Sequence, residues 1–255
     1  MNGVTLTWVG TGLVHSKIAS PNFNERIGGA AVSILLLHYT GMETATQARE
    51  WLCAAGSEVS CHYLVDEHGA ITQMVDERMR AWHAGTGSWH GVEDVNSRSI
   101  GIEIHNPGHA KGYVDFPPIQ MASVAELCRD ILTRHKILAR DVLAHSDIAP
   151  ARKIDPGEKF DWKYLHEKVV GHLVVPEPLS GGSFLQAGDQ GDAVLALQSL
   201  LKLYGYGIQL TGIFDDDTRL TVAAFQRHFR QTKVDGVADA STVATLHKLL
   251  RAQEF

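Results

Sequence analysis

The sequence predicts an α/β fold: a central mixed β-sheet with flanking helices, followed by a small three-helix domain. Short apolar runs alternate with amphipathic segments as far as residue 172, and the chain beyond residue 183 shows a helical pattern only. Between them, residues 173–183 ("LVVPEPLSGGS") are rich in proline, glycine and serine. We therefore expect a first domain over 1–172, a linker over 173–183 and a second domain over 184–255, each burying its own core. The alternative for 173–183 is a long surface loop within one domain.

Four segments of the first part have the pattern of β-strands. Residues 31–39 ("AVSILLLHY") form a near-continuous apolar run, which is typical of a strand buried on both faces. Residues 61–75 ("CHYLVDEHGAITQMV") predict a hairpin, and residues 141–146 ("DVLAHS") predict a short strand. Residues 99–105 ("SIGIEIH") alternate in character. One side of that strand then carries Ile100, Ile102 and Ile104, and the other carries Gly101, Glu103 and His105.

Helices are expected around these strands, over residues 44–56, 117–136 and 161–172. The second of them keeps its apolar residues at helical spacing. After the linker, residues 192–207 predict another helix. Two further segments share the pattern Gly-[Ile/Val]-x-Asp-x-x-Thr, beginning at Gly212 and Gly236. In each, a glycine turn leads to an aspartate helix cap, which completes a compact three-helix unit.

The composition excludes several classes of protein. The 255-residue chain has a formal net charge of −6. This argues against a nucleic-acid binder or an anionic-membrane binder, because both rely on Lys and Arg. No apolar run approaches the roughly 18 residues of a transmembrane helix. The start, "MNGVTLTWVGTGLVHSK", lacks the basic region and long apolar run of a signal peptide, so the protein is made without one or has had it removed.

The three cysteines do not indicate a thiol-based mechanism. Cys53, Cys61 and Cys128 form no CxxC pair, which excludes a cysteine zinc cluster. Cys61 adjoins His62, but neighbouring residues on a strand point to opposite faces. The two side chains therefore cannot form a catalytic dyad.

Histidines are concentrated in the first part, where twelve of the 14 lie at or before His172. His38 ends an apolar strand, His145 follows another, and Asp155 lies ten residues further on in a loop. Two imidazoles and a carboxylate are a common ligand set for catalytic zinc, which lowers the pKa of a bound water to about 7. The residues alone leave open that these are ordinary surface or core side chains.

Two further residues are candidates for catalysis. Glu103 lies on the polar side of an otherwise apolar strand, where a carboxylate is costly unless it has a partner or a task. It could accept a proton from water, or it could form a salt bridge to Arg98 or Arg152. Lys153, two residues before Asp155, could stabilise a developing oxyanion, or it could be a solvated loop lysine.

The motifs together resemble the zinc-dependent N-acetylmuramoyl-L-alanine amidases of the amidase type-2 family, which are related to peptidoglycan recognition proteins. Within residues 31–162 the matching segments occur in order: "LLLHYTG", "SCHYLVDEHGAI", "RAWHAGTGSW", "VNSRSIGIEIHN" and "HSDIAPARKIDPG", followed by "FDW". The resemblance implies one catalytic zinc ion per chain, held by His38, His145 and Asp155. It further implies that Glu103 is the general base and that Lys153 stabilises the oxyanion.

The same resemblance implies a substrate-binding groove lined by residues of the shared segments, namely His62, Tyr63, Trp82, His83 and Asn96. Trp82 could pack on a sugar face or be a core tryptophan. His62 and His83 could support the zinc ligands. The C-terminal part resembles the three-helix peptidoglycan-binding module of wall hydrolases, through "LQAGDQGDAVLALQSLL", "YGYGIQLTGIFDDDTRLTVAAFQRHF" and "VDGVADASTVATL". Such a module raises the effective concentration of a polymeric substrate, unless it merely packs on the first domain.

These resemblances imply hydrolysis of the amide between N-acetylmuramic acid and L-alanine, in cell-wall turnover or recycling. The partners would be peptidoglycan or muropeptides. The alternatives are a non-catalytic peptidoglycan receptor and a phage-type endolysin. The extra module favours the bacterial periplasm or envelope, whereas the missing signal favours the cytoplasm.

Overall fold

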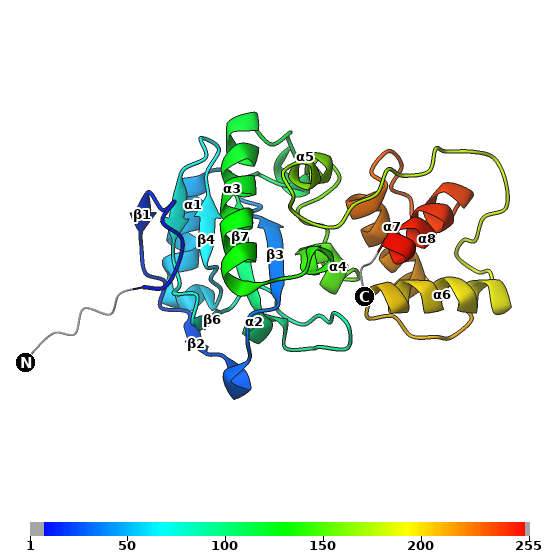
Figure 1. Cartoon of the computed structure of the whole chain (residues 1–255), viewed down its shortest axis with the longest axis horizontal. Coiled ribbons are helices and arrows are strands. Elements are labelled where there is room, and N and C mark those ends of the chain that lie inside the picture. Colours follow the sequence, from blue (N-terminus) through cyan, green and yellow to red (C-terminus); the bar gives the residue numbers. More distant parts are fainter. Residues whose placement is uncertain (1–7, 253–255) are drawn as a thin grey trace, which may run out of the picture.

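The computed structural model describes residues 8–252 and has two units joined by an extended segment (Figure 1). The first unit is a sheet covered by helices and the second is a cluster of three helices, as the sequence predicts. Residues 1–7, which begin the segment considered for an export signal, lie outside the described residues, as do 253–255. None of the helices within 8–252 combines the length and apolarity needed to cross a membrane.

A six-stranded mixed sheet forms the centre of the first unit. Strands β4, β7, β3 and β8 run parallel to one another, whereas β5 is antiparallel to β4 and completes the predicted hairpin. The order across the sheet is β1 (Ser16–Lys17), β5 (Ile71–Gln73), β4 (Tyr63–Val65), β7 (Ser99–Ile104), β3 (Ile34–Tyr39) and β8 (Val142–Ala144).

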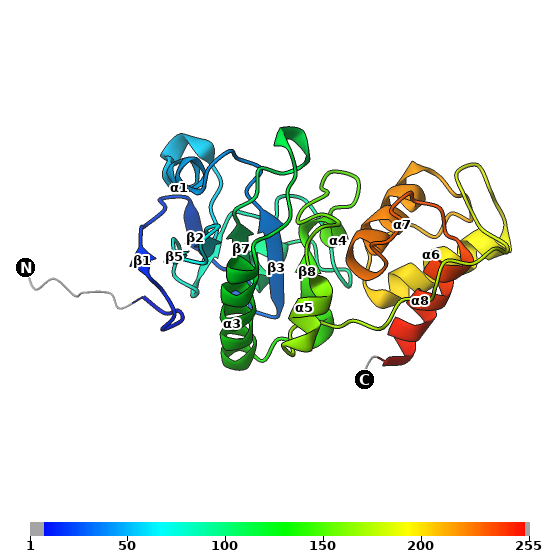
Figure 2. The ribbon, with the colours of Figure 1, turned by 90° about the horizontal axis from the view of Figure 1, so that it is seen from above.

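Helices cover both faces of this sheet. On one face, α3 (Pro118–His135) and α5 (Trp162–Glu167) pack against Ile100, Ile102 and Ile104 of β7, as the alternation in 99–105 predicts. On the opposite face, α1 (Ala45–Cys53) packs against Leu64 of β4 (Figure 2). Helix α5 ends five residues earlier than expected. Close beyond its end, Val169 has a left-handed φ of 63°.

Several short elements were not predicted. β2 (Phe23–Glu25) and β6 (Met79–Ala81) form a separate antiparallel pair. Two helices of a single turn are also present: α2 (Val95–Arg98), directly before β7, and α4 (His145–Ile148), directly after β8. The remaining turns are 3₁₀ helices at Ile27–Gly29, Ala55–Ser57, His109–Lys111 and Ala139–Asp141.

The second unit consists of α6 (Asp192–Tyr204), α7 (Asp216–Phe229) and α8 (Ala240–Ala252). Its internal repeat folds as predicted. The Asp215 carboxylate accepts a hydrogen bond from the Thr218 N–H (2.9 Å), and the Asp239 carboxylate accepts one from the Thr242 N–H (2.8 Å). Each pair caps the start of a helix and satisfies a backbone donor there.

The expectation of a separate core in each unit holds for the main cluster of the first unit, but another buried cluster crosses between the two units. It joins Leu36 and Leu143 of the sheet to residues of all three C-terminal helices. Trp89 lies in the middle, only 1% exposed, with its ring edge-on to Tyr204 and Tyr206. No pattern in the sequence indicates that the loop around Trp89 contacts the C-terminal helices. The sequence therefore predicts two domains with independent cores.

Residues 173–183 have no regular secondary structure, as expected of a linker, but part of the segment is held against α8. The Ser241 hydroxyl donates to the Glu177 carbonyl (2.5 Å), and the Glu177 N–H donates to Thr245 Oγ1 (3.0 Å). The linker and the shared core therefore fix how the second unit sits on the first.

Candidate metal centre and its pocket

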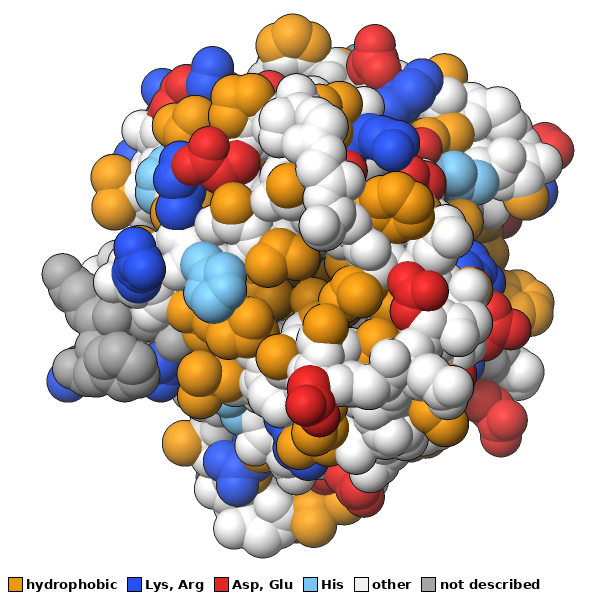
Figure 3. All heavy atoms as spheres, turned by 90° about the vertical axis from the view of Figure 1, so that its right-hand side faces the viewer, with side chains coloured by type: hydrophobic (Ala, Val, Ile, Leu, Met, Phe, Trp, Pro, Cys, Tyr) orange, Lys and Arg blue, Asp and Glu red, His pale blue; other side chains and the backbone are white. Residues whose placement is uncertain are grey.

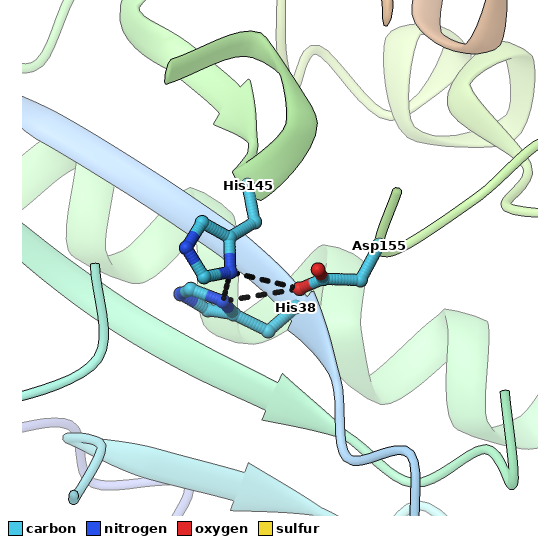
Figure 4. Close-up of side chains that lie close together, drawn as sticks. All are labelled: His38, His145 and Asp155. Atoms are coloured by element: carbon cyan, nitrogen blue, oxygen red, sulfur yellow. Dashed lines mark hydrogen bonds and ion pairs between the residues drawn. The ribbon is translucent and has the colours of Figure 1, made fainter. Parts of the chain in front are cut away.

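Three side chains from separate parts of the chain meet at the carboxyl ends of the parallel strands (Figure 4). His38 comes from β3, His145 begins α4 directly after β8, and Asp155 follows in the loop. The His38 Nδ1 atom lies 2.9 Å from His145 Nδ1 and 3.3 Å from Asp155 Oδ2, and His145 Nδ1 lies 3.1 Å from the same oxygen. All three residues are buried.

The outer nitrogen of each histidine is engaged, and for His145 the partner fixes the tautomer. His145 Nε2 lies 2.9 Å from the Ala84 carbonyl, which only accepts, so Nε2 carries the proton and Nδ1 presents a lone pair. His38 Nε2 lies 3.0 Å from His83 Nδ1, and His83 Nε2 lies 3.2 Å from Ser99 Oγ. This chain of contacts can hold the His38 proton on Nε2 and leave Nδ1 free to bind.

Three potential electron-pair donors thus converge on one point, an arrangement that a cation between them would stabilise. In a tetrahedral zinc site with ligand bonds of about 2.0–2.1 Å, the donor atoms lie about 3.3 Å apart. The separations of 2.9–3.3 Å are close to that value. The donor set and its spacing therefore fit zinc.

The electrostatics of the cluster support the same protonation states. Burial, reinforced by His145, lowers the pKa of His38 to about 4, so this imidazole is neutral at physiological pH. Burial alone would raise the pKa of Asp155, but His145 and His38 hold it well below its usual range. A neutral imidazole and an ionised carboxylate are the forms that bind a metal.

Glu103 lies beside the cluster and has no hydrogen-bond or ion-pair partner among the residues that the structure describes. It is the cross-strand neighbour of His38 in the β3–β7 pair. Its Oε2 atom is buried and has no hydrogen-bond partner, and no ion pair to Glu103 occurs within residues 8–252. Burial raises the pKa of Glu103 well above its ordinary value, and Asp155 adds to this rise. The alternative of a salt bridge to Arg98 or Arg152 is therefore wrong.

The cluster forms one wall of a pocket of about 390 Å³, a size suited to a small ligand. Glu103 and Lys153 face this pocket together with the three proposed ligands, and Trp82 and Trp51 contribute apolar surface. Trp82 is half-buried, and its indole N–H donates to Asn24 Oδ1 (2.8 Å), so it is not a core tryptophan. The Glu103 carboxyl group, the Lys153 ammonium group and the three proposed metal ligands thus line the same pocket.

Two residues of the predicted substrate groove support the cluster, and only one of them, His83, also lines the pocket. His83 contacts His38, as described, and its ring fills the space above Gly101 of β7, where an added Cβ would lie 2.5 Å from the ring. Asn96 is buried, and its side-chain oxygen accepts from the N–H groups of His83 (3.0 Å) and Ala84 (2.9 Å). His83 reaches the pocket wall, whereas Asn96 lies behind it.

His62 and Tyr63 do not line the pocket, which corrects the prediction for both. Tyr63 pairs with Ile102 on the face of the sheet that α3 and α5 cover, and its hydroxyl donates to Glu77 Oε1 (2.5 Å). His62 is fully buried beneath β7, where its Nδ1 accepts from the Gly101 N–H (3.0 Å). Strand alternation could have placed Tyr63, because it shares a face with Ile102.

Arg152 is a site residue whose contacts the sequence did not indicate. Its guanidinium donates to the carbonyls of Ala84 (2.8 Å) and Thr86 (2.6 Å) and lies against Gly85. The Ala84 carbonyl therefore accepts from both Arg152 and His145. Arg152 thereby links the loop carrying Asp155 to the segment that orients His145.

Comparisons with known proteins match both parts of the chain. Residues 28–158 match the family model for N-acetylmuramoyl-L-alanine amidase, and residues 190–246 match that for a putative peptidoglycan binding domain. The chain is 34% identical over 234 residues to the N-acetylmuramoyl-L-alanine amidase AmiD of Escherichia coli K12, covering 86% of this chain and 82% of the relative.

Two solved structures are similar over nearly the whole chain. One is E. coli AmiD in complex with the substrate anhydro-N-acetylmuramic acid-L-Ala-D-gamma-Glu-L-Lys, with a TM-score of 0.75 and 33% identity, covering 90% of this chain and 97% of that one. The other is Pseudomonas aeruginosa AMPDH3 in complex with anhydromuramic pentapeptide, with a TM-score of 0.69 and 28% identity, covering 97% of each chain.

Proposed function

The chain belongs to the N-acetylmuramoyl-L-alanine amidase family, and from that premise we propose that it hydrolyses the amide bond between N-acetylmuramic acid and L-alanine with one zinc ion. One observation carries the proposal. His38, His145 and Asp155 converge in a single pocket beside Glu103, a carboxyl group that pairs with no other side chain in the described part of the chain. A buried carboxyl group is costly without a partner, which favours a catalytic task over a purely binding one.

Zinc is the metal that the donors favour, since two imidazole nitrogens and one carboxylate oxygen leave a fourth position for water or substrate. When bound, zinc supplies a Lewis acid and lowers the pKa of water at the site. The chain contributes the rest. The Ala84 carbonyl holds the His145 proton on Nε2 and leaves Nδ1 free to bind, and the contact of His38 Nε2 with His83 allows the same arrangement for His38.

Glu103 and Lys153 have separate tasks in the proposed reaction. The Glu103 carboxylate accepts the proton of the attacking water and passes it to the amine of L-alanine as the C–N bond breaks. The Lys153 ammonium stabilises the negative charge that develops on the carbonyl oxygen. Both residues face the pocket that holds the three ligands, so one substrate amide can reach them together.

We propose soluble anhydromuropeptides as one substrate class, with a role in cell-wall turnover or recycling. The support is that AmiD and AMPDH3, both similar to this chain throughout, were solved with such molecules. The pocket offers the half-exposed Trp51 and the partly buried Trp82 for the apolar face of a sugar.

The second unit would bind the polymer. Its outer face shows apolar side chains gathered around a hollow (Figure 3). Exposed large hydrophobic residues of this unit include Phe184, Leu203 and Ile213. We propose that this surface holds the enzyme on peptidoglycan.

The proposed activity is tested by incubating purified protein with anhydromuropeptides and identifying products by mass. Free stem peptide should appear with the zinc-loaded protein. Activity should disappear after chelation and return when zinc is restored. Intact sacculi, treated in parallel, report whether the polymer is also a substrate. A protein that binds these ligands but releases no peptide in any metal-loaded state would be a receptor instead.

We also propose that the protein works in the bacterial periplasm or envelope. The support is the polymer-binding unit, which has a use where the sacculus lies. Fractionation of cells carrying the untagged gene tests this proposal, and recovery only with cytoplasmic markers would contradict it.

A further inference from the structure

The C-terminal unit contacts the loop that carries the proposed metal ligands. This contact centres on Asp147, which lies two residues after His145 in α4 and is fully buried. The Asp147 Oδ2 atom accepts from the Ala144 N–H (2.8 Å), the donor at the start of this helical turn. Asp147 therefore stabilises the turn that presents His145.

The other two partners of Asp147 come from the C-terminal unit. Tyr206 donates its hydroxyl proton to Asp147 Oδ1 at 2.7 Å. His228 of α7 places its Nδ1 atom 2.7 Å from Asp147 Oδ2, and both of these side chains are buried. The His228 ring is stacked on Trp162 of α5 with centroids 3.7 Å apart, so its position is fixed from both units.

The far end of the same loop is held as well. Gln231, two residues after α7, donates through Nε2 to the carbonyls of Glu158 (2.9 Å) and Phe160 (2.7 Å). These carbonyls follow Asp155 by three and five residues. Between the two ends, the Ser146 N–H donates to the Asp155 carbonyl (3.1 Å) and ties the two ligand segments together.

We propose that the C-terminal unit positions the metal-binding loop, with Tyr206, His228 and Gln231 as positioning residues. The unit thereby helps to set the metal affinity of the catalytic pocket, in addition to any contact with polymer. This inference rests on the proposed function, because it concerns the loop that would hold zinc.

The physical reason is that a buried carboxylate is stable only while its donors are in place. Removing the His228 donor leaves Asp147 with two of its three hydrogen bonds in a buried site. The turn from Ala144 to Asp147 can then shift to find another donor, and His145 moves with it. Changes to groups that orient metal ligands typically cost about 10- to 100-fold in affinity.

The test uses the full-length chain in three variants. His228→Leu removes the donor at Asp147, and His228→Asn keeps an amide nitrogen near the place of Nδ1. Gln231→Ala releases the far end of the loop. Two quantities are measured: zinc affinity, by competition with a chromophoric chelator, and hydrogen exchange over residues 145–160 in the metal-free protein.

We expect His228→Leu and Gln231→Ala to weaken zinc binding about 10-fold and to speed exchange over 145–160. His228→Asn should restore most of both. Gln198→Met is the matched control. Gln198 is buried and bonds Thr211 and Thr218 inside the C-terminal unit, away from Asp147. This control should lower the melting temperature and leave zinc affinity near the wild-type value.

Two results would overturn the inference: unchanged zinc affinity and exchange in His228→Leu, or an equal loss in Gln198→Met, which would indicate general destabilisation. Failure of the proposed function would look different. The wild-type protein would then bind no zinc or release no peptide, while exchange over 145–160 would still report whether His228 and Gln231 hold the loop.

Discussion

Replacing Glu103 by Gln separates catalysis from metal binding. The substitution keeps the side chain's shape and removes its ability to take a proton. Glu103 is not one of the three converging ligands, and no other described residue hydrogen-bonds its buried Oε2 atom. We therefore expect zinc content and ligand affinity to survive in Glu103→Gln while turnover falls.

The size of the effect follows from the role. Loss of a general base lowers rates by roughly 10²- to 10⁴-fold, which corresponds to about 2.7–5.5 kcal/mol at 1.36 kcal/mol per decade. The free energy of unfolding should not fall with turnover. An unsatisfied buried polar group costs about 1–3 kcal/mol, and more when it is charged, and the substitution removes the charge. The metal-free Gln variant should be at least as stable as the wild-type protein at neutral pH.

The pH dependence of that stability difference has a defined sign. The pKa of Glu103 is raised on folding, so the folded protein holds a proton that the unfolded chain releases near its ordinary value of 4.5. Stability from this group is therefore fully present below pH 4.5 and falls as pH rises above it. The metal-free wild-type and Gln proteins should have similar stability in acid and diverge as pH increases.

The assay combines release of stem peptide under saturating substrate, zinc content by elemental analysis, and denaturant unfolding at several pH values. Glu50→Gln is the matched control, because Glu50 is exposed on α1 and lies outside the pocket. Turnover above about a tenth of wild type in a fully metal-loaded Glu103→Gln protein would refute the assignment of Glu103 as the base.

Further predictions concern the ligands, the oxyanion and the surrounding structure. His145→Ala should lower zinc occupancy together with turnover, since it removes one of three protein ligands; full zinc by elemental analysis would contradict this. Lys153→Ala should retain zinc and lose about 10²-fold in kcat. An unchanged kcat would show that Lys153 is a solvated loop lysine without a catalytic role. Gly101→Ala should cost about 1–3 kcal/mol in unfolding free energy and lower activity, because its Cβ would meet the His83 ring; Gly56→Ala, which meets nothing within 4 Å, is the control. Burial alone would raise the pKa of Glu77, but hydrogen bonds from His135, Arg134 and Tyr63 lower it from 4.5 to about 2. The ionised Glu77 therefore contributes about 3 kcal/mol to the free energy of unfolding above pH 4.5, and this contribution is lost as pH falls toward 2. In Glu77→Gln, the free energy of unfolding should fall by that much less over the same pH range.

Sequence patterns predicted the main strands and helices because their periodicity is set by the faces they bury. The alternation around Glu103 placed it opposite the apolar face of β7, as the structure has it. The pattern did not predict α4, since four residues within a polar loop show no period. For Tyr63 the family resemblance predicts a groove residue and strand parity predicts the face of Ile102; the structure follows strand parity.

The contact between the two units left no signal in the sequence either. No sequence pattern distinguishes Trp89, Tyr206 and His228 from other side chains of their own domains. The structure shows that all three lie where the two units meet. Surfaces that meet within a chain have no periodicity of their own, because their geometry depends on how two finished units dock.

The shared core also bears on the order in which the protein matures during synthesis. His38, Glu103, His145 and Asp155 all leave the ribosome before α7 exists. His228 and Gln231, which hold the loop of His145 and Asp155, lie within the last 28 residues of the 255-residue chain. A nascent chain therefore carries every reacting group before the contacts that hold the loop exist, and a product truncated before α7 carries the same groups without those contacts.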